Sequence, residues 1–318
     1  MSIKIRGIGK GTPQRNVSNE ELAGFLDTSN EWIVSRTGIA SRFVCTDESL
    51  TDLSTTAALQ AIERSGLTPY DIDLVMCTTI GGDYRTPSLA CCVLERLGIQ
   101  CPAFDVNAAC TGFLYALDLA AAHLCRGSNK NILIISAEMM STQTDWKDRN
   151  TCVLFGDGAA ACVVSTGTAL RYLKLSAQGN SSVLKIASGT GNSPFVTTKQ
   201  DNTFLHMHGQ EVFKFAINIV EAEMKQVLEE LSMSAEDIDW FVLHQANKRI
   251  IESIRVKSKQ PQEKFLCNIE RHGNVSSASV PLLLFEAIEE KKIRHGDTLF
   301  ITAFGAGMTW GSCVMVWE

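Results

Sequence analysis

The chain has 318 residues and a formal net charge of −6, from 29 basic and 35 acidic side chains. Hydrophobic residues make up 45% of it and charged residues 20%, which excludes a wholly disordered chain. The acidic balance argues against a nucleic-acid-binding protein, because such proteins normally carry a basic excess. The length suits one large domain or two of ordinary size.

The eleven cysteines have the spacing of buried thiols. Cys-x-x-Cys pairs do not occur, so a zinc site is not expected. Several cysteines lie in apolar runs, as Cys77, Cys162 and Cys313 do. Residues Met1–Gly11 carry regular charges and no apolar signal-peptide core. These features predict a cytoplasmic protein with reduced cysteines.

Helical and strand patterns alternate along the chain. Helices are predicted from apolar spacing and from glycines that follow them, and each precedes an apolar strand. The predicted helices are Thr51–Ser65, Phe113–Arg126, Val212–Leu231 and Pro281–Lys292. This alternation predicts an α/β fold with mixed, mostly parallel sheets covered by helices.

Two glycine-containing stretches need a separate interpretation. Thr298–Trp317 has no charged residue and is long enough to span a bilayer, but three glycines interrupt it. We interpret it as two buried strands around a glycine turn. Gly179–Gly191 is interpreted as a loop and not as a domain boundary.

The sequence repeats itself at an interval of 166 residues, from Asp71 to Asp237 and from Asn131 to Asp297. Each Asp-Ile-Asp motif precedes an apolar strand, and Asn131–Ala137 shares three identical positions with Asp297–Ala303. Two matches at one interval indicate a duplication. We therefore expect two similar α/β halves, residues 1–166 and 167–318, which pack together.

Cys110 is the strongest nucleophile candidate. It follows a short apolar strand and begins a helix among small residues, in the run Asn107–Gly112. The positive end of a helix dipole can lower a thiol pKa and so activate the sulfur. The setting is similar to a nucleophile elbow with sulfur in place of oxygen. The alternative is one more buried core cysteine.

Two further polar residues lie where a catalytic partner is expected. His244 ends the second apolar strand after an Asp-Ile-Asp motif, at the sheet edge where α/β folds bind ligands. Asn274 falls two residues from the position that the repeat makes equivalent to Cys110. A glycine–asparagine turn is the alternative for Asn274, and His272 is a competing candidate.

Two more clusters suggest ligand contacts. Trp32 and Arg36 are four residues apart on a predicted helix, which suits stacking on a base and pairing with a phosphate, or else a surface cation–π pair. Basic residues concentrate after His244, at Lys248, Arg249, Arg255, Lys257 and Lys259. They suit an acidic partner, or else they form a solvated helix face.

The motifs together resemble the β-ketoacyl-acyl-carrier-protein synthase III family, which has the thiolase fold and starts bacterial fatty-acid synthesis. The similarity runs from about residue 4 to residue 317 and is carried by Asn107–Gly112, His244–Asn247, Gly273–Asn274, Phe304–Gly311, Glu31–Ile39 and Phe155–Ala160. Many relatives have a third glycine where Ala306 stands, and a large aromatic residue where Thr86 stands.

The resemblance implies a condensation of a primer acyl-CoA with malonyl-acyl-carrier protein, with loss of CoA and carbon dioxide, in a homodimer without cofactor or metal. It implies a Cys110, His244 and Asn274 triad, with an oxyanion hole from the backbone N–H groups of Cys110 and Ala306. CoA would contact Thr28, Trp32, Arg36, Arg149, Gly209, Phe213 and Asn247. The acyl pocket would include Phe304 and Thr86, which reaches in from the partner subunit. The carrier protein would bind Lys214, Lys248, Arg249, Arg255 and Lys257.

Two alternatives use the same residues. A condensing enzyme of secondary metabolism would share every motif and differ in its acyl donor. A cysteine acyl-thioester hydrolase would use Cys110 and His244 but would release a free acid.

Overall fold

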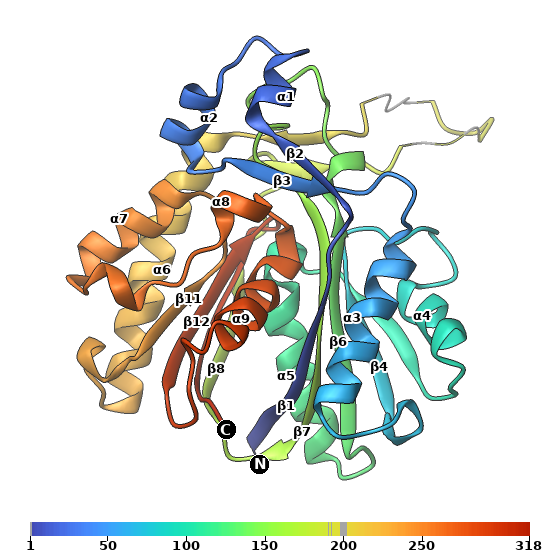
Figure 1. Ribbon diagram of the computed structural model, residues 1–318, viewed down its shortest axis with the longest axis vertical. Helices are drawn as coiled ribbons and strands as arrows, with labels where there is room; N and C mark the ends of the chain where they lie inside the picture. The colour runs from blue at the N-terminus through green and yellow to red at the C-terminus, as the bar shows by residue number, and fades with distance from the viewer. Residues whose placement is uncertain (1, 190, 192, 198–201) are drawn as a thin grey trace.

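Two mixed β-sheets organise the part of the chain that the computed structural model describes, which is residues 2–189, 191, 193–197 and 202–318 (Figure 1). The first sheet has the strand order β1 (Ser2–Gly11), β7 (Asp157–Gly167), β6 (Asn131–Met139), β4 (Leu74–Thr78) and β5 (Ala103–Val106). The second has the order β11 (Trp240–Leu243), β12 (Thr298–Gly305), β13 (Thr309–Val316) and β8 (Leu170–Ala177). Two small antiparallel sheets pair β2 (Arg15–Ser18) with β3 (Ser41–Val44) and β9 (Leu184–Ile186) with β10 (Leu205–Met207).

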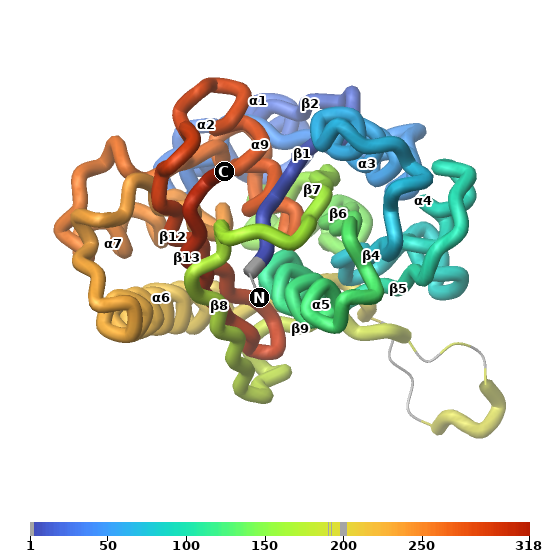
Figure 2. The backbone as a smooth tube through the Cα atoms, turned by 90° about the horizontal axis from the view of Figure 1, so that it is seen from below, coloured from blue at the N-terminus to red at the C-terminus, as the bar shows by residue number. Residues whose placement is uncertain are grey.

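Helices lie outside and between the large sheets. Helix α5 packs against strands of both sheets, and so does α9 (Figure 2). The result is a layered order of helix, sheet, helix, sheet and helix. The central helices are α5 (Gly112–Cys125) and α9 (Ser279–Glu289), and the outer ones are α3 (Leu50–Arg64), α4 (Leu89–Leu97), α6 (Gly209–Leu231) and α7 (Lys248–Ser258). The short helices α1 (Asn19–Ala23), α2 (Asn30–Thr37) and α8 (Ile269–His272) lie on the loops.

The structure confirms the predicted helices to within a few residues and the predicted pair of strands in Thr298–Trp317. Within the described chain, no helix has the length and apolarity needed to cross a membrane. The Gly179–Gly191 stretch contains β9, which the loop interpretation missed, and its Thr190 lies outside the described residues.

The sheets are less parallel than the sequence suggested. Parallel pairs join β4 to β5 and to β6 in the first sheet and β11 to β12 in the second, whereas the other pairings of these two sheets are antiparallel. The link between β12 and β13 has only three residues, which is too short for a parallel crossover. Burial of both faces by helices, rather than parallel pairing, explains the continuous apolar strands.

The repeat is visible in matching hydrogen bonds. The Asp73 carboxylate accepts from Asn131 N at 2.9 Å, and the Asp239 carboxylate accepts from Thr298 N at 2.8 Å. In the repeat, Asn131 therefore corresponds to Thr298, which is one residue later than Asp297, the position that the 166-residue interval predicts. We retain the division into halves 1–166 and 167–318 as a prediction that these contacts support.

The same one-residue difference occurs at the site-bearing turns. Asn107 Oδ1 accepts from Ala109 N at 3.2 Å, as Asn274 Oδ1 accepts from Ser276 N at 2.9 Å. Ala109 and Ser276 both have positive φ, at 47° and 46°. In the repeat, Asn274 thus corresponds to Asn107. Our expectation that Asn274 lies two residues from the position equivalent to Cys110 is therefore wrong.

The largest buried apolar cluster lies around the central helices and joins side chains of both sheets. Leu117 on α5 is fully buried there. We predict that Leu117→Ala lowers the free energy of unfolding by about 2–5 kcal/mol, because the cavity would lie between two sheets that cannot collapse onto it. Leu59→Ala on the outer face of α3, where the side chain is 48% exposed, is the matched control and should cost much less. Equal losses in chemical denaturation would contradict this account of the core.

Candidate active site

Loops from both sheets line one cavity of about 1650 Å³. The loop before α5 contributes Cys110, and the residue after β11 contributes His244. Asn274 precedes the short turn that leads into α9, and Ala306 lies between β12 and β13. Residues that are far apart in the sequence therefore face a common space at the carboxyl ends of β5, β11 and β12.

Cys110 lies in a 3₁₀ turn, Ala109–Thr111, directly before α5. Gly305 packs so closely on it that a Cβ at this glycine would lie 2.9 Å from the Cys110 backbone nitrogen. Ser276 Oγ donates to Cys110 Sγ at 3.4 Å. A larger residue than glycine at 305 would displace the sulfur-bearing turn.

The expectation of a lowered thiol pKa at Cys110 is wrong. Burial raises the pKa of this thiol to about 11, although the Ser276 hydroxyl opposes the shift, and the nearby Glu138 carboxylate raises it further. The sequence shows that a helix begins here but not how segments from elsewhere in the chain pack around the sulfur. The resting thiol is therefore neutral.

His244 is buried and held on two sides. Its backbone N–H donates to Thr302 O at 2.9 Å, and its Nδ1 is 2.6 Å from Ser279 Oγ. The ring of Phe304 meets the imidazole edge-on, with 5.3 Å between ring centroids. Burial lowers the pKa of His244 to about 3, so this imidazole is neutral at physiological pH.

Asn274 and His272 face in different directions. Asn274 lines the cavity, and its Oδ1 accepts from Ser276 N, which leaves the side-chain NH₂ group as the available donor. His272 is buried outside the cavity lining, with Nε2 2.7 Å from Glu286 Oε1. Of the two candidates in this segment, the structure brings Asn274 to the cavity.

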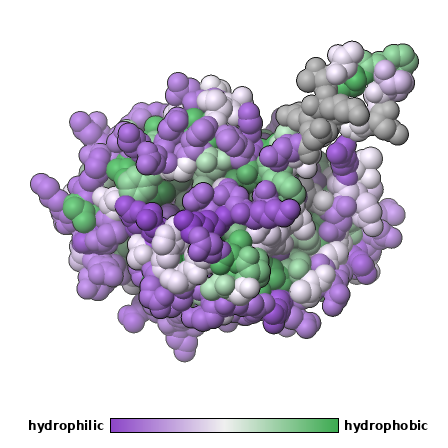
Figure 3. All heavy atoms as spheres, turned by 90° about the horizontal axis from the view of Figure 1, so that it is seen from above, coloured by the Kyte–Doolittle hydropathy of each residue, from purple (hydrophilic) through white to green (hydrophobic). Residues whose placement is uncertain are grey.

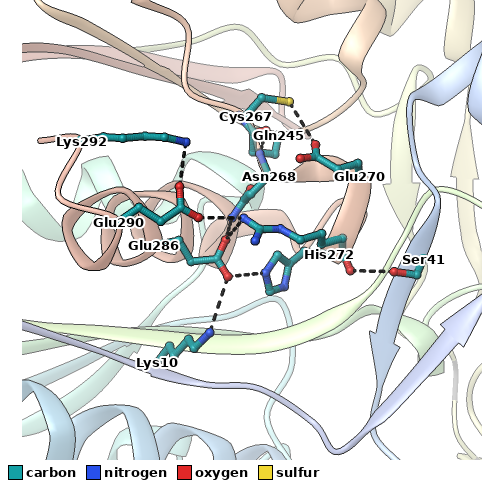
Figure 4. A network of polar contacts seen from close by, with 11 residues as sticks. Lys10, Ser41, Gln245, Cys267, Asn268, Glu270, His272, Glu286, Glu290 and Lys292 are labelled. Carbon is teal, nitrogen blue, oxygen red and sulfur yellow. Dashed lines mark hydrogen bonds and ion pairs between the residues drawn. The ribbon is translucent and has the colours of Figure 1, made fainter. Parts of the chain in front are cut away.

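A polar network joins the segment that follows β11 to the segment that precedes α9 (Figure 4). Its centre is Glu286 on α9, which accepts from Asn268 Nδ2 at 3.0 Å and from Arg271 Nη2 at 2.9 Å, besides its contact with His272. Asn268 N in turn donates to Gln245 Oε1 at 3.2 Å. The network therefore connects Gln245, the residue after His244, with the segment that precedes Asn274.

An aromatic and cationic cluster marks the outer part of the cavity. Trp32 and Arg36 share one face of α2, with the guanidinium carbon 4.9 Å from the indole centroid. Arg149 lies 5.2 Å from the same ring. Asn247 Nδ2 donates to Arg36 O at 3.1 Å, and Arg249 lies 5.6 Å from the Phe213 ring.

The other predicted contact residues divide into two groups. The cavity lining includes Trp32, Arg36, Gly209, Phe213, Lys214, Asn247, Arg249, Phe304 and Ala306. Outside the lining lie Thr28, Thr86, Arg149, Lys248, Arg255 and Lys257. Two of the predicted basic contacts are already paired, Arg255 with Glu252 at 2.5 Å and Lys257 with Glu221 at 2.5 Å.

The sequence analysis missed three residues that contact the site or its supports. Ser276 touches the thiol, Ser279 touches the imidazole and Glu286 joins the supporting network. The serines are visible in the sequence as a small-residue run after Asn274. Their hydroxyl directions depend on the turn, which residue types alone do not define.

The layered arrangement of sheets and helices is that of the thiolase-like condensing enzymes. Family models for 3-oxoacyl-[acyl-carrier-protein (ACP)] synthase III match residues 104–181, and models for its C-terminal part match residues 228–317. The chain is 41% identical to the β-ketoacyl-[acyl-carrier-protein] synthase III of Clostridium perfringens, over 99% of each chain. The chain belongs to the β-ketoacyl-acyl-carrier-protein synthase III family and is an acyltransferase.

Solved structures agree with this family. The 3-oxoacyl-[acyl-carrier-protein] synthase III of Aquifex aeolicus VF5 superposes with a TM-score of 0.92 at 38% identity, covering 99% of this chain and 100% of that one. The priming β-ketosynthase of the R1128 polyketide pathway superposes with a TM-score of 0.92 at 31% identity, covering 99% of this chain and 96% of that one.

The Glu286 network predicts a pH dependence of stability. Burial alone would raise the pKa of Glu286, but hydrogen bonds from His272 and Asn268 and the charge of Arg271 lower it to about 2. Since the folded pKa lies below the ordinary value of 4.5, the stabilisation is present above pH 4.5 and is lost as the pH falls towards 2. We expect the free energy of unfolding of Glu286→Gln to fall less steeply than that of the wild type between pH 4.5 and 2. Chemical denaturation across this range, with exposed Glu63→Gln as control, tests it, and parallel wild-type and Glu286→Gln curves would contradict it.

Proposed function

We propose that the chain condenses a primer acyl-CoA with malonyl-acyl-carrier protein to 3-oxoacyl-acyl-carrier protein, releasing CoA and carbon dioxide, and so starts fatty-acid synthesis. The observation that carries the proposal is the common cavity of Cys110, His244 and Asn274, in a chain of this family. A nucleophile and two hydrogen-bond donors are the groups that an acyl transfer followed by a decarboxylation needs.

In the first half-reaction, Cys110 Sγ attacks the thioester carbon of the acyl-CoA. A bond forms from sulfur to the acyl carbon, the bond from that carbon to the CoA sulfur breaks, and the thiol proton leaves with CoA. The backbone N–H groups of Cys110 and Ala306 are the proposed donors to the developing oxyanion. The Ser276 hydroxyl, 3.4 Å from the sulfur, stabilises the developing thiolate.

In the second half-reaction, His244 and Asn274 donate hydrogen bonds to the thioester oxygen of malonyl-acyl-carrier protein. Loss of carbon dioxide leaves an enolate whose negative charge these donors stabilise. The carbon of the enolate attacks the acyl group on Cys110, and the bond from that group to the sulfur breaks. The sulfur leaves as thiolate and takes up one proton from solvent, because the original thiol proton left with CoA. A neutral imidazole suits this role, because it keeps one N–H to donate.

The charge states argue against His244 as the base that activates Cys110. A histidine base would take the thiol proton and give a thiolate and an imidazolium. With the pKa of Cys110 raised to about 11 and that of His244 lowered to about 3, the proton stays on sulfur in the resting site. His244 is therefore proposed as a hydrogen-bond donor and not as a base.

The outer part of the cavity is proposed to hold CoA. Trp32 and Arg149, whose guanidinium carbon lies 5.2 Å from the indole centroid, are proposed to sandwich the adenine, and the Arg36 cation suits a phosphate. Gly209, Phe213 and Asn247 line the path inward, and Thr28 is proposed as a contact at the rim.

The rim of the cavity is proposed to bind the acidic carrier protein. Lys214 and Arg249 line the cavity, and Lys248, Arg255 and Lys257 continue along α7. The face that carries α1 and α2 is mainly hydrophilic with hydrophobic groups between (Figure 3). This mixed surface suits a charged partner whose interface with the chain stays partly open to solvent.

We also propose a cytoplasmic homodimer. Thr86 is exposed and follows Arg85, which lines the cavity, and the neighbouring Tyr84 is 62% exposed. In a dimer, Thr86 would limit the acyl pocket of the partner subunit, together with that pocket's Phe304. The smaller threonine would leave room for longer or branched primers than an aromatic residue allows.

A priming enzyme of secondary metabolism is the second candidate. It is favoured by the TM-score of 0.92 with the priming β-ketosynthase of the R1128 pathway, which shares 31% identity. The 41% identity over the full length with a β-ketoacyl-[acyl-carrier-protein] synthase III supports fatty-acid synthesis as the first. Intact-mass measurement with a panel of acyl-CoAs separates the two, because they differ in the primer.

The nucleophile assignment predicts the behaviour of Cys110→Ala. This variant should form no acyl adduct with acyl-CoA, since Cys110 is the only cysteine among the described residues that line the cavity. Intact-mass spectrometry measures the adduct, with exposed Cys91→Ala as the control that should keep full acylation. An adduct on Cys110→Ala at wild-type stoichiometry would refute the assignment.

The carrier-protein surface predicts a difference between the half-reactions. Arg249→Glu should lower kcat/KM for malonyl-acyl-carrier protein about tenfold, equivalent to about 1.4 kcal/mol, and the effect should shrink as salt rises. Acylation by acyl-CoA should change little. The control is Arg171→Glu, an exposed charge reversal on β8. Equal loss in both half-reactions would assign Arg249 to CoA binding or stability instead.

A further inference from the structure

The contact between His244 and Ser279 has no assigned role in the condensation. His244 Nδ1 and Ser279 Oγ are 2.6 Å apart, and both side chains are buried, at 2% and 3% exposure. Ser279 is the first residue of α9, the central helix, so its position is fixed by packing between the two sheets. The His244 imidazole therefore contacts a Ser279 hydroxyl that is held in position by the packing of α9 in the core.

A neutral imidazole has one N–H group and one bare nitrogen, and the two arrangements are chemically different. If Nδ1 carries the proton, it donates to Ser279 and leaves Nε2 as an acceptor. If Ser279 donates to Nδ1, the proton is on Nε2. Since Nδ1 is already paired, Nε2 is the nitrogen available to a substrate in the cavity that His244 lines.

We propose that Ser279 is a positioning residue that donates to His244 Nδ1 and thereby keeps the proton on Nε2, where the malonyl thioester oxygen needs a donor. This inference rests on the proposed function, because only the decarboxylation requires a donor at that point. An acceptor at Nε2 would repel the enolate oxygen instead of stabilising it. The Phe304 ring, edge-on at 5.3 Å, provides no competing hydrogen bond.

Kinetics of the separate half-reactions test the proposal. Ser279→Ala should lower the rate of malonyl-acyl-carrier protein decarboxylation about 10- to 100-fold, the range expected when a buried hydrogen bond to a reacting group is lost. Acylation of Cys110 by acyl-CoA should stay within about twofold of wild type, because it does not use the Nε2 proton. Ser279→Thr keeps the hydroxyl and should restore most of the decarboxylation. Ser54→Ala on α3 removes an equally buried serine hydroxyl that makes no hydrogen bond and should change neither rate.

Nitrogen NMR of the histidine-labelled protein measures the tautomer directly. Wild type should show the His244 proton on Nε2, and Ser279→Ala should show a mixture. A wild-type proton on Nδ1, or a Ser279→Ala variant that loses both half-reactions equally, would overturn the proposal. If Ser279→Ala does not fold, the wild-type spectrum and Ser279→Thr decide it.

His244→Ala separates this inference from the proposed function. Decarboxylation that is lost in His244→Ala but normal in Ser279→Ala would refute only the role of Ser279. Decarboxylation that survives His244→Ala would refute the proposed function itself.

Discussion

The burial of α5 and α9 between the two sheets is the constraint on which the site depends. Each of these helices begins at the cavity. The turn before α5 carries Cys110. The turn before α9 follows Asn274 and leads to Ser279, which touches His244. Since both helices are packed on two sides, the positions of their first turns are determined by the largest apolar cluster of the protein.

The same burial determines the charges in the cavity. Burial raises the pKa of Cys110 and lowers that of His244, so that both groups stay neutral, although Cys110 also lines the cavity. Glu286 behaves in the opposite way, because three donors surround its carboxylate and keep it charged. The protein therefore keeps Cys110 and His244 neutral while Glu286 behind them stays charged, which favours hydrogen-bond donation over base catalysis.

Much of this arrangement could be predicted from the sequence. Strand ends and helix starts indicated Cys110 and His244, and the family motifs added Asn274. The repeat stays a prediction that matching hydrogen bonds support, and one extra residue in the second half makes the interval between matching contacts one residue longer than predicted. The lowered pKa that the sequence predicts for Cys110 is wrong, because Gly305 and Ser276, which pack against this residue, lie more than 160 residues away in the sequence. The Glu286 network has no local signal either, because a glutamate on a helix is ordinary until its partners are placed around it.

The account depends most on the step in which the acyl group on Cys110 is transferred to the enolate carbon derived from malonyl-acyl-carrier protein and not to water. Acyl-enzyme prepared with a labelled acyl-CoA and freed from excess CoA should be mixed with malonyl-acyl-carrier protein, and the label should be followed by mass spectrometry. Our account predicts that the label leaves the enzyme as 3-oxoacyl-acyl-carrier protein, with one carbon dioxide released for each acyl group transferred. Release of the label as free acid, at the same rate with and without malonyl-acyl-carrier protein, would contradict it.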